Sequence, residues 1–133
     1  MAVIDLASLE NAIKTLDEII LRYDKEFYDN AIRDALIQRF EYTYSLTLKF
    51  ISRFLKLMLP ELEDNLTFNE IIREANNYGL LRSDLEKWTE YRKKRNLSSH
   101  TYNEEVAKDV VSIVKDFRDE AHCVLEQLKK NND

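Results

Sequence analysis

The sequence predicts an all-α fold, an antiparallel up-and-down four-helix bundle with one short extra helix. The 133 residues include one Gly and one Pro, whereas β-sandwiches and barrels need turn residues at roughly every 8–12 positions. Apolar residues recur three and four positions apart along most of the chain, which is the spacing of a buried helix face. Seven Tyr, six Phe and one Trp supply enough surface for a packed core, so a disordered chain is excluded. We expect residues 1–133 to form a single domain.

The first two predicted helices are long and amphipathic. One runs from about Asp5 to Tyr23 and the next from about Ile32 to Pro60, which cannot continue a helix. The second helix is therefore about 30 residues or about 45 Å long, and we expect it to form the centre of the bundle. The apolar stripes are Leu6, Leu9, Ile13, Leu16, Ile20 and Tyr23 in the first helix, and Ile32, Leu36, Phe40, Tyr44, Leu48, Ile51, Leu55 and Met58 in the second.

Capping patterns predict where the remaining helices begin. Thr67 and Glu70 have the spacing of a capping box, and the short helix that they open should end at Gly79 in a left-handed conformation. Residues 83–86 (Ser-Asp-Leu-Glu) have the same form, and Asn103 should cap the last helix. The inward faces are Leu85, Trp88 and Tyr91 in the fourth helix, and Val106, Val110, Ile113, Phe117, Ala121, Val124 and Leu128 in the last.

The composition excludes several classes of function. A single Gly is incompatible with a Walker loop or a dinucleotide fingerprint, which both need several glycines. One Cys and two His without paired spacing give no zinc or di-iron site, so we expect no metal and no cofactor. His122 is expected to be an ordinary surface or partly buried histidine. The lone Cys123, the lack of a signal peptide and the lack of a long apolar run predict a cytoplasmic protein that does not enter a membrane.

Basic residues are concentrated in one segment although the net charge is −5. The run Arg92, Lys93 and Lys94 is either a solvated helix face or a track that binds the RNA backbone or a phosphate, with salt-dependent affinity. Tyr42 and Tyr44 either belong to the core or stack on bases.

Arg95 occupies a position at which the register of Trp88 and Tyr91 requires an apolar residue. Burial of an unpaired guanidinium is unfavourable, so Arg95 must meet an acid, a polar cleft or an anion. His100 follows where the helix should unwind. Such a pair suits RNA cleavage, in which an imidazole removes the 2′-hydroxyl proton and a guanidinium stabilises the phosphate. The alternative interpretation is structural: Arg95 would pair with Glu41 inside the bundle, and His100 would cap a turn.

The segment from Arg95 to Tyr102 resembles the Arg-x4-His-x-Tyr signature of HEPN-domain proteins, with Asn96 matching the polar residue that often follows the arginine. Residues 38–42 (Gln-Arg-Phe-Glu-Tyr) resemble the corresponding segment of the nucleotidyltransferase substrate-binding subfamily. The resemblance extends over nearly the whole chain, in the number and order of the helices and the placement of both motifs.

This resemblance implies a toxin–antitoxin pair in which the chain is a metal-independent endoribonuclease. Its catalytic pair would be Arg95 and His100, brought together with their symmetry mates at a dimer cleft. The partner would be a cognate minimal nucleotidyltransferase that attaches AMP to Tyr102, and the assembly would be a homodimer or a heterotetramer with that partner. The alternative is a non-catalytic nucleotide- or substrate-binding subunit of a two-component nucleotidyltransferase, in which Arg95 holds a phosphate.

Two further expectations concern the surroundings of this site. Glu41 is either the acid that orients Arg95 or His100, or a solvated carboxylate. The long helices also carry more large apolar residues than one core of this size needs, which predicts a two-fold dimer interface. The surplus residues are Phe50, Phe54, Leu57 and Leu59.

Overall fold

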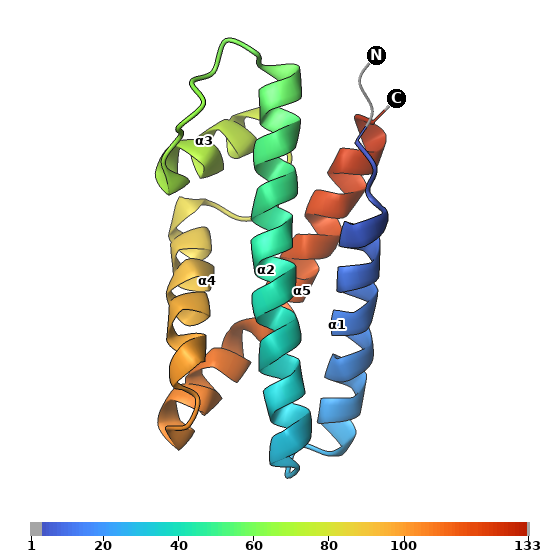
Figure 1. The fold of residues 1–133 in the computed structure, drawn as a ribbon, viewed down its shortest axis with the longest axis vertical. Helices are drawn as coiled ribbons and strands as arrows, with labels where there is room; N and C mark the ends of the chain where they lie inside the picture. The colour runs from blue at the N-terminus through green and yellow to red at the C-terminus, as the bar shows by residue number, and fades with distance from the viewer. Residues whose placement is uncertain (1–3, 133) are drawn as a thin grey trace.

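Five α-helices and one short 3₁₀ segment form the computed structural model, which describes residues 4–132 (Figure 1). Consecutive long helices run in opposite directions, and the short α3 lies across the upper end of α4. No strand occurs in this range, so the predicted all-α class is confirmed. The elements are α1 (Ala7–Lys25), α2 (Asn30–Met58), α3 (Phe68–Tyr78), α4 (Leu85–Leu97), η1 (Ser98–His100) and α5 (Glu104–Lys130).

The core is centred on α2, which contacts every other element, as its predicted length indicated. An aromatic cluster fills the space between α2, α4 and α5. The ring of Phe117 on α5 lies at its middle, with ring centroids 5.3 to 6.1 Å from those of four neighbours. Those neighbours are Phe40, Tyr44, Trp88 and Tyr91, and the whole cluster is buried.

The caps agree with the sequence at three of the four predicted positions. Thr67 and Glu70 form the reciprocal capping box, Gly79 has a φ of +90°, and the Asn103 side chain accepts from two amides of α5. At α4 the cap is Asp84 and not Ser83, because the Asp84 carboxylate accepts the Lys87 amide 3.1 Å away. With a lysine three residues after the cap, no reciprocal box forms.

The side chains that predicted a dimer interface are largely part of the core. Phe50 and Phe54 are 3% and 2% exposed, and Leu59 is partly buried against the core. Only Leu57, at 44% exposure, lies on the surface. The expectation based on these residues is wrong, because α2 packs on several sides and its buried face is wider than one stripe. The dimer itself stays a prediction.

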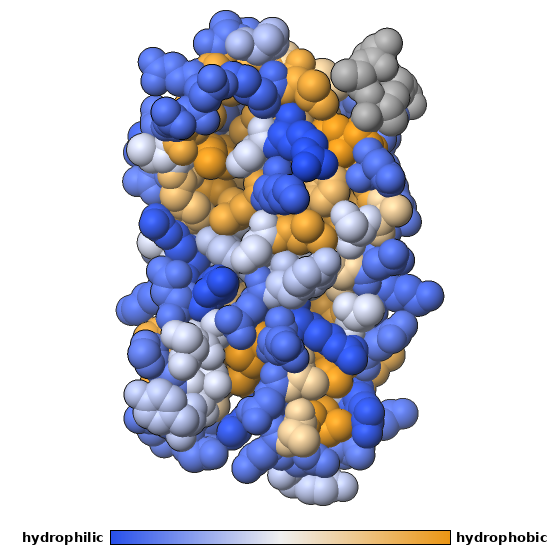
Figure 2. Space-filling view, viewed as in Figure 1, coloured by the Kyte–Doolittle hydropathy of each residue, from blue (hydrophilic) through white to orange (hydrophobic). Residues whose placement is uncertain are grey.

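The surface is mostly polar, and apolar side chains appear in Figure 2 mainly beside the upper part of α2. None of the helices within residues 4–132 has the length and apolar character needed to cross a membrane. The two ends of the described chain lie together at one end of the bundle. There the Asn132 side chain donates to the Ile4 carbonyl and accepts from the Ile4 amide, each at 2.8 Å.

Candidate functional site

The residues from Arg95 to Asn103, here called the 95–103 turn, connect α4 to α5 at the end of the bundle away from the termini (Figure 1). Ser98 is responsible for part of this turn, since its hydroxyl donates to the Arg95 carbonyl at 2.6 Å and competes with the helical pattern. The chain continues for one 3₁₀ turn to His100 and then enters α5 at the Asn103 cap.

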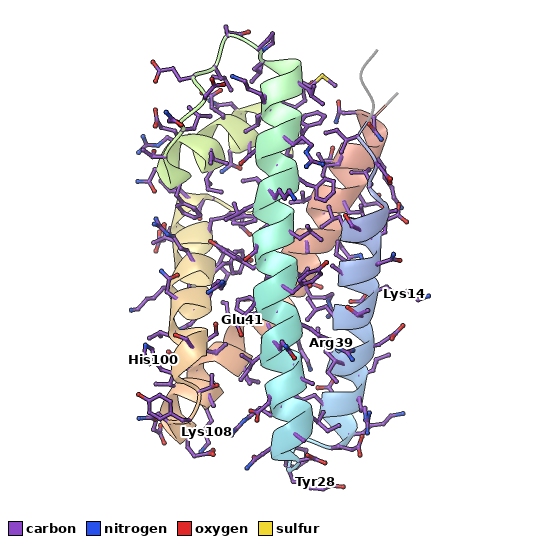
Figure 3. The ribbon with its side chains drawn as sticks, viewed as in Figure 1. Lys14, Tyr28, Arg39, Glu41, His100 and Lys108 are labelled. Carbon is purple, nitrogen blue, oxygen red and sulfur yellow. The ribbon has the colours of Figure 1, made fainter. Side chains whose placement is uncertain are left out.

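Arg95 lies at the edge of the core and faces α2. Its Nη1 atom is 3.9 Å from Oε2 of Glu41, and the two side chains are 37% and 31% exposed. Figure 3 shows Glu41 on the side of α2 that faces α4. Arg95 is therefore half-buried and not fully inside the core, because Tyr91 is the last fully buried residue of α4. The guanidinium does meet an acid.

His100 and Tyr102 lie together on the exposed side of the turn. Their ring centroids are 6.0 Å apart in an edge-to-face arrangement, and Tyr102 is 86% exposed. Among the described residues the partner of Arg95 is Glu41, and no hydrogen bond joins Arg95 to His100. The structure therefore brings His100 to Tyr102 and Arg95 to Glu41, but it records no contact between the two pairs.

A shallow groove of about 440 Å³ runs along α4 to the imidazole of His100. Two cations, Arg92 and Lys93, lie beside largely apolar lining surface, and the full lining is Thr89, Arg92, Lys93, Asn96, Leu97 and His100. The Arg92 guanidinium lies 4.7 Å from the centre of the Phe68 ring, which holds this cation at the edge of the groove.

Lys94 differs from the other members of the basic run. Its ammonium is 2.7 Å from the Asp109 carboxylate on α5, and its side chain is only 14% exposed. The exposed run therefore contains two cations, Arg92 and Lys93, and not the three that the sequence offered. Consecutive residues of an α-helix point in directions about 100° apart, so Lys94 is directed toward α5 while Lys93 faces solvent.

Tyr44 belongs to the core and is not available to stack on bases. It is 5% exposed, and burial raises the pKa of its hydroxyl to about 12 although the positive charges of Arg92 and Arg95 oppose the shift. The hydroxyl has no hydrogen-bond partner among the described residues. Tyr42, two residues earlier and therefore on the opposite side of α2, is 58% exposed.

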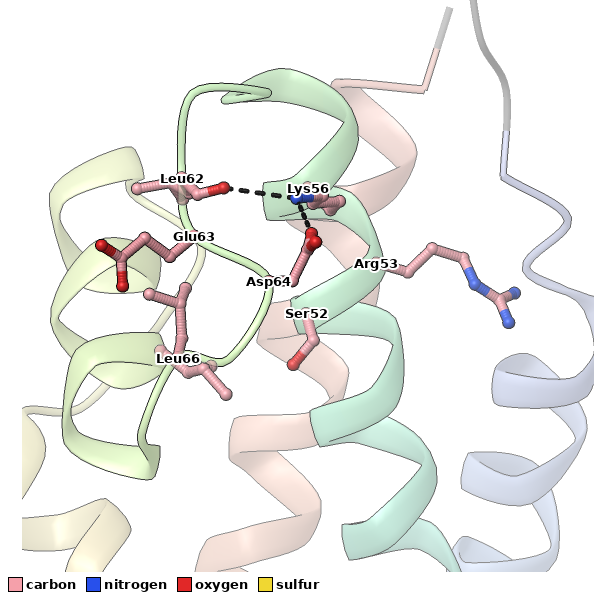
Figure 4. Close-up of a pocket in the computed structure, with 8 residues that line it drawn as sticks. Ser52, Arg53, Lys56, Leu62, Glu63, Asp64 and Leu66 are labelled. Carbon is pink, nitrogen blue, oxygen red and sulfur yellow. Dashed lines mark hydrogen bonds and ion pairs between the residues drawn. The ribbon is translucent and has the colours of Figure 1, made fainter.

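Other clusters contain none of the predicted catalytic residues. A pocket between α2 and the loop before α3 is closed by Lys56, whose ammonium bonds the Asp64 carboxylate and the Leu62 carbonyl, while Arg53 points away (Figure 4). His122 is a surface residue as expected, 2.7 Å from the Asp17 carboxylate. Within residues 4–132 no three metal-ligating side chains form a cluster.

Arg33 is a buried cation that the sequence reasoning missed. Its side chain is 11% exposed, and Nη1 donates to the Glu104 carboxylate at 2.8 Å. The sequence did contain a signal for it, because Arg33 lies between Ile32 and Leu36 in the apolar stripe of α2. A cation among apolar positions of a helix was also the feature that singled out Arg95.

Comparison with known proteins decides the family. The family model described as "Nucleotidyltransferase substrate binding protein like" matches residues 4–130. The chain belongs to this family. The resemblance stated from residues 38–42 and the 95–103 turn is thereby confirmed.

Known proteins are similar to this chain over nearly the full length of both partners in each comparison. A Haemophilus influenzae protein named "Probable ribonuclease HepT" is 34% identical over an alignment 139 positions long. The alignment covers 97% of this chain and 94% of that protein. A solved structure from H. influenzae, described as the fold of a substrate binding domain of a nucleotidyltransferase, has a TM-score of 0.87 at 32% identity and covers 94% of this chain and 99% of its own. A Thermus thermophilus crystal structure has a TM-score of 0.71 at 32% identity, covering 90% and 98%.

Proposed function

We propose that the chain is a metal-independent endoribonuclease, the toxin of a two-component system in which a cognate minimal nucleotidyltransferase silences it by attaching AMP to Tyr102. The observation that carries the proposal is the 95–103 turn: the imidazole of His100 lines a groove together with Arg92 and Lys93, the exposed phenol of Tyr102 lies beside that imidazole, and the guanidinium of Arg95 lies on the α2 side of the same turn. Similarity to a protein named probable ribonuclease HepT supports the same reaction class.

In the proposed reaction His100 acts as the general base. It accepts the proton of an RNA 2′-hydroxyl while the 2′-oxygen attacks the adjacent phosphorus. The bond from phosphorus to the 5′-oxygen of the next nucleotide breaks, and that oxygen takes a proton from an imidazolium or from water. The products are a 2′,3′-cyclic phosphate and a 5′-hydroxyl, and Arg95 stabilises the negative charge that builds up on the phosphorane oxygens.

The complete site requires two protomers in this proposal. Within one chain Arg95 faces Glu41 on α2, whereas His100 lines the groove on α4. A two-fold homodimer, alone or in a heterotetramer with the nucleotidyltransferase, would bring both copies of Arg95 and His100 to one cleft. Arg92 and Lys93 would guide the RNA backbone to it, and Asn96 in the groove would bind the phosphate.

Cleavage of RNA in the presence of EDTA tests the catalytic assignment. We expect the purified chain to cleave, and His100→Ala and Arg95→Ala to lower the rate by about 10²- to 10⁴-fold. His122→Ala is the matched control, because His122 is also an exposed histidine but pairs with Asp17, outside the 95–103 turn, and this variant should cleave like the wild type. If EDTA stops cleavage, or if both site variants retain full activity, the assignment is wrong.

AMP transfer tests the regulatory assignment. The Tyr102 hydroxyl oxygen attacks the α-phosphorus of ATP, the bond to the β-phosphate oxygen breaks, pyrophosphate leaves, and the phenolic proton passes to a base of the transferase or to solvent. After incubation with the nucleotidyltransferase and ATP, intact mass should increase by one or more AMP units. Tyr102→Phe should lose this increase, whereas Tyr42→Phe, which removes another exposed tyrosine hydroxyl, should keep it.

The second candidate is a non-catalytic subunit that binds a nucleotide or another acceptor for the transferase. Two observations favour it: the family is described by substrate binding, and Arg95 lies beside Glu41 and not beside His100. Expression of the isolated chain separates the two functions. Growth arrest that requires His100 supports the nuclease, whereas nucleotide binding without arrest or cleavage supports the binding subunit.

A further inference from the structure

The 95–103 turn is flanked on each side by an ion pair whose cation is almost fully covered. On the α4 side Lys94, which directly precedes Arg95, is 14% exposed and lies 2.7 Å from Asp109. On the α5 side Glu104, which directly follows Asn103, is held at 2.8 Å by Arg33, whose side chain is 11% exposed. The first pair joins the end of α4 to α5, and the second joins the start of α5 to α2.

These two pairs differ from the other ion pairs between helices. In those pairs the exposed fraction of the cation ranges from 27% for Arg118 with Asp17 and 32% for Lys87 with Asp116 to 59% for Lys115 with Asp24, so water screens them more. A covered cation is screened less, and it loses its compensating charge if the partner moves away. Arg33 and Lys94 therefore resist displacement of their partners more strongly than surface cations do.

We propose that Arg33 and Lys94 are positioning residues that fix the 95–103 turn between α2 and α5. The inference rests on the proposed function, since it concerns the placement of the proposed catalytic pair and of Tyr102. Neither cation lines the groove, and each acts through its carboxylate partner: Glu104 two residues after Tyr102, and Asp109 five residues further along α5. Together they determine the direction in which the turn presents its imidazole and phenol.

Methionine substitutions test the proposal while sparing the fold. Arg33→Met and Lys94→Met keep an apolar stem against the core and leave behind carboxylates that are 60% and 45% exposed, so both variants should fold. We expect faster amide hydrogen exchange at residues 98–103 in both. In RNA cleavage kcat should fall by about tenfold to a hundredfold, while KM stays unchanged because Arg92 and Lys93 remain in place.

Two control variants make the result specific. Lys115→Met removes an interhelical ion pair outside the turn and should leave exchange at 98–103 and kcat unchanged. Lys94→Arg keeps the charge and should retain wild-type behaviour. Unchanged exchange at 98–103 in both Met variants overturns the proposal. If the wild type does not cleave RNA, the proposed nuclease fails by itself, and the exchange rates together with AMP transfer to Tyr102 still decide the positioning role.

Discussion

Substitution of Glu41 by glutamine separates a role in orienting Arg95 from a role in holding the bundle together. Two unit charges 3.9 Å apart attract by about 1 kcal/mol in water and by about 4 kcal/mol at an effective dielectric constant of about 20. Both side chains are about one-third exposed, and measured values for such pairs are about 0–1 kcal/mol after solvent screening and side-chain entropy. We therefore expect Glu41→Gln to lower Tm by no more than about 4 °C.

The effect on activity should be larger than the effect on stability. If Glu41 orients the guanidinium, its loss allows Arg95 to take up other rotamers, and misplacement of such a group by about 1 Å reduces rates by up to about 10²-fold. The assay combines thermal unfolding with single-turnover RNA cleavage. Glu10→Gln is the control, because Glu10 also pairs with a cation on another helix, 3.4 Å from Lys129.

Two results would refute this reasoning. A decrease in Tm far beyond about 4 °C would mean that the Glu41 carboxylate is a structural partner of Arg95. Unchanged cleavage together with an unchanged Tm would mean that Glu41 is a solvated carboxylate without a role in the site.

Three further predictions concern stability. Phe117→Ala removes the central ring of the aromatic cluster and should lower the free energy of unfolding by about 3–5 kcal/mol in urea denaturation, whereas Phe27→Ala, at 68% exposure, should change it by less than about 0.5 kcal/mol. Thr67→Ala breaks the capping box and should reduce stability by about 1 kcal/mol, with Thr67→Ser restoring it. The hydrogen bond and the charge of Arg33 hold the pKa of Glu104 below its ordinary value of 4.5. The ionised Glu104 therefore stabilises the folded state fully above pH 4.5, and this stabilisation is lost as the pH falls through the lowered pKa. Glu104→Gln should therefore show a smaller decrease in Tm than the wild type on acidification below about pH 4.5, and an identical acid dependence would exclude the linkage.

The helices and their caps could be predicted because their signals are local. Helical periodicity, the Thr67–Glu70 box and Gly79 depend only on residues within a few positions of one another, and the structure has them where expected. The placement of Asp84 at the α4 cap was missed because Ser and Asp are nearly equivalent as caps, so sequence alone does not choose between neighbours.

Features that depend on which helices surround a residue could not be predicted in the same way. Phe50 and Phe54 appeared to be surplus because the sequence does not show that α2 packs on several sides. Lys94 appeared to be exposed because the sequence does not place Asp109 beside it. The position of Arg95 was anticipated as an anomaly of the register, but its solution, pairing with Glu41 at the edge of the core, depends on the distance between α2 and α4.

The clasp between Ile4 and Asn132 has a practical consequence for handling the protein. Ile4 and Asn132 lie at the pole opposite His100. A molecule immobilised on a sensor chip through a cysteine introduced at Asn132 would thus present the His100 pole to the flowing analyte.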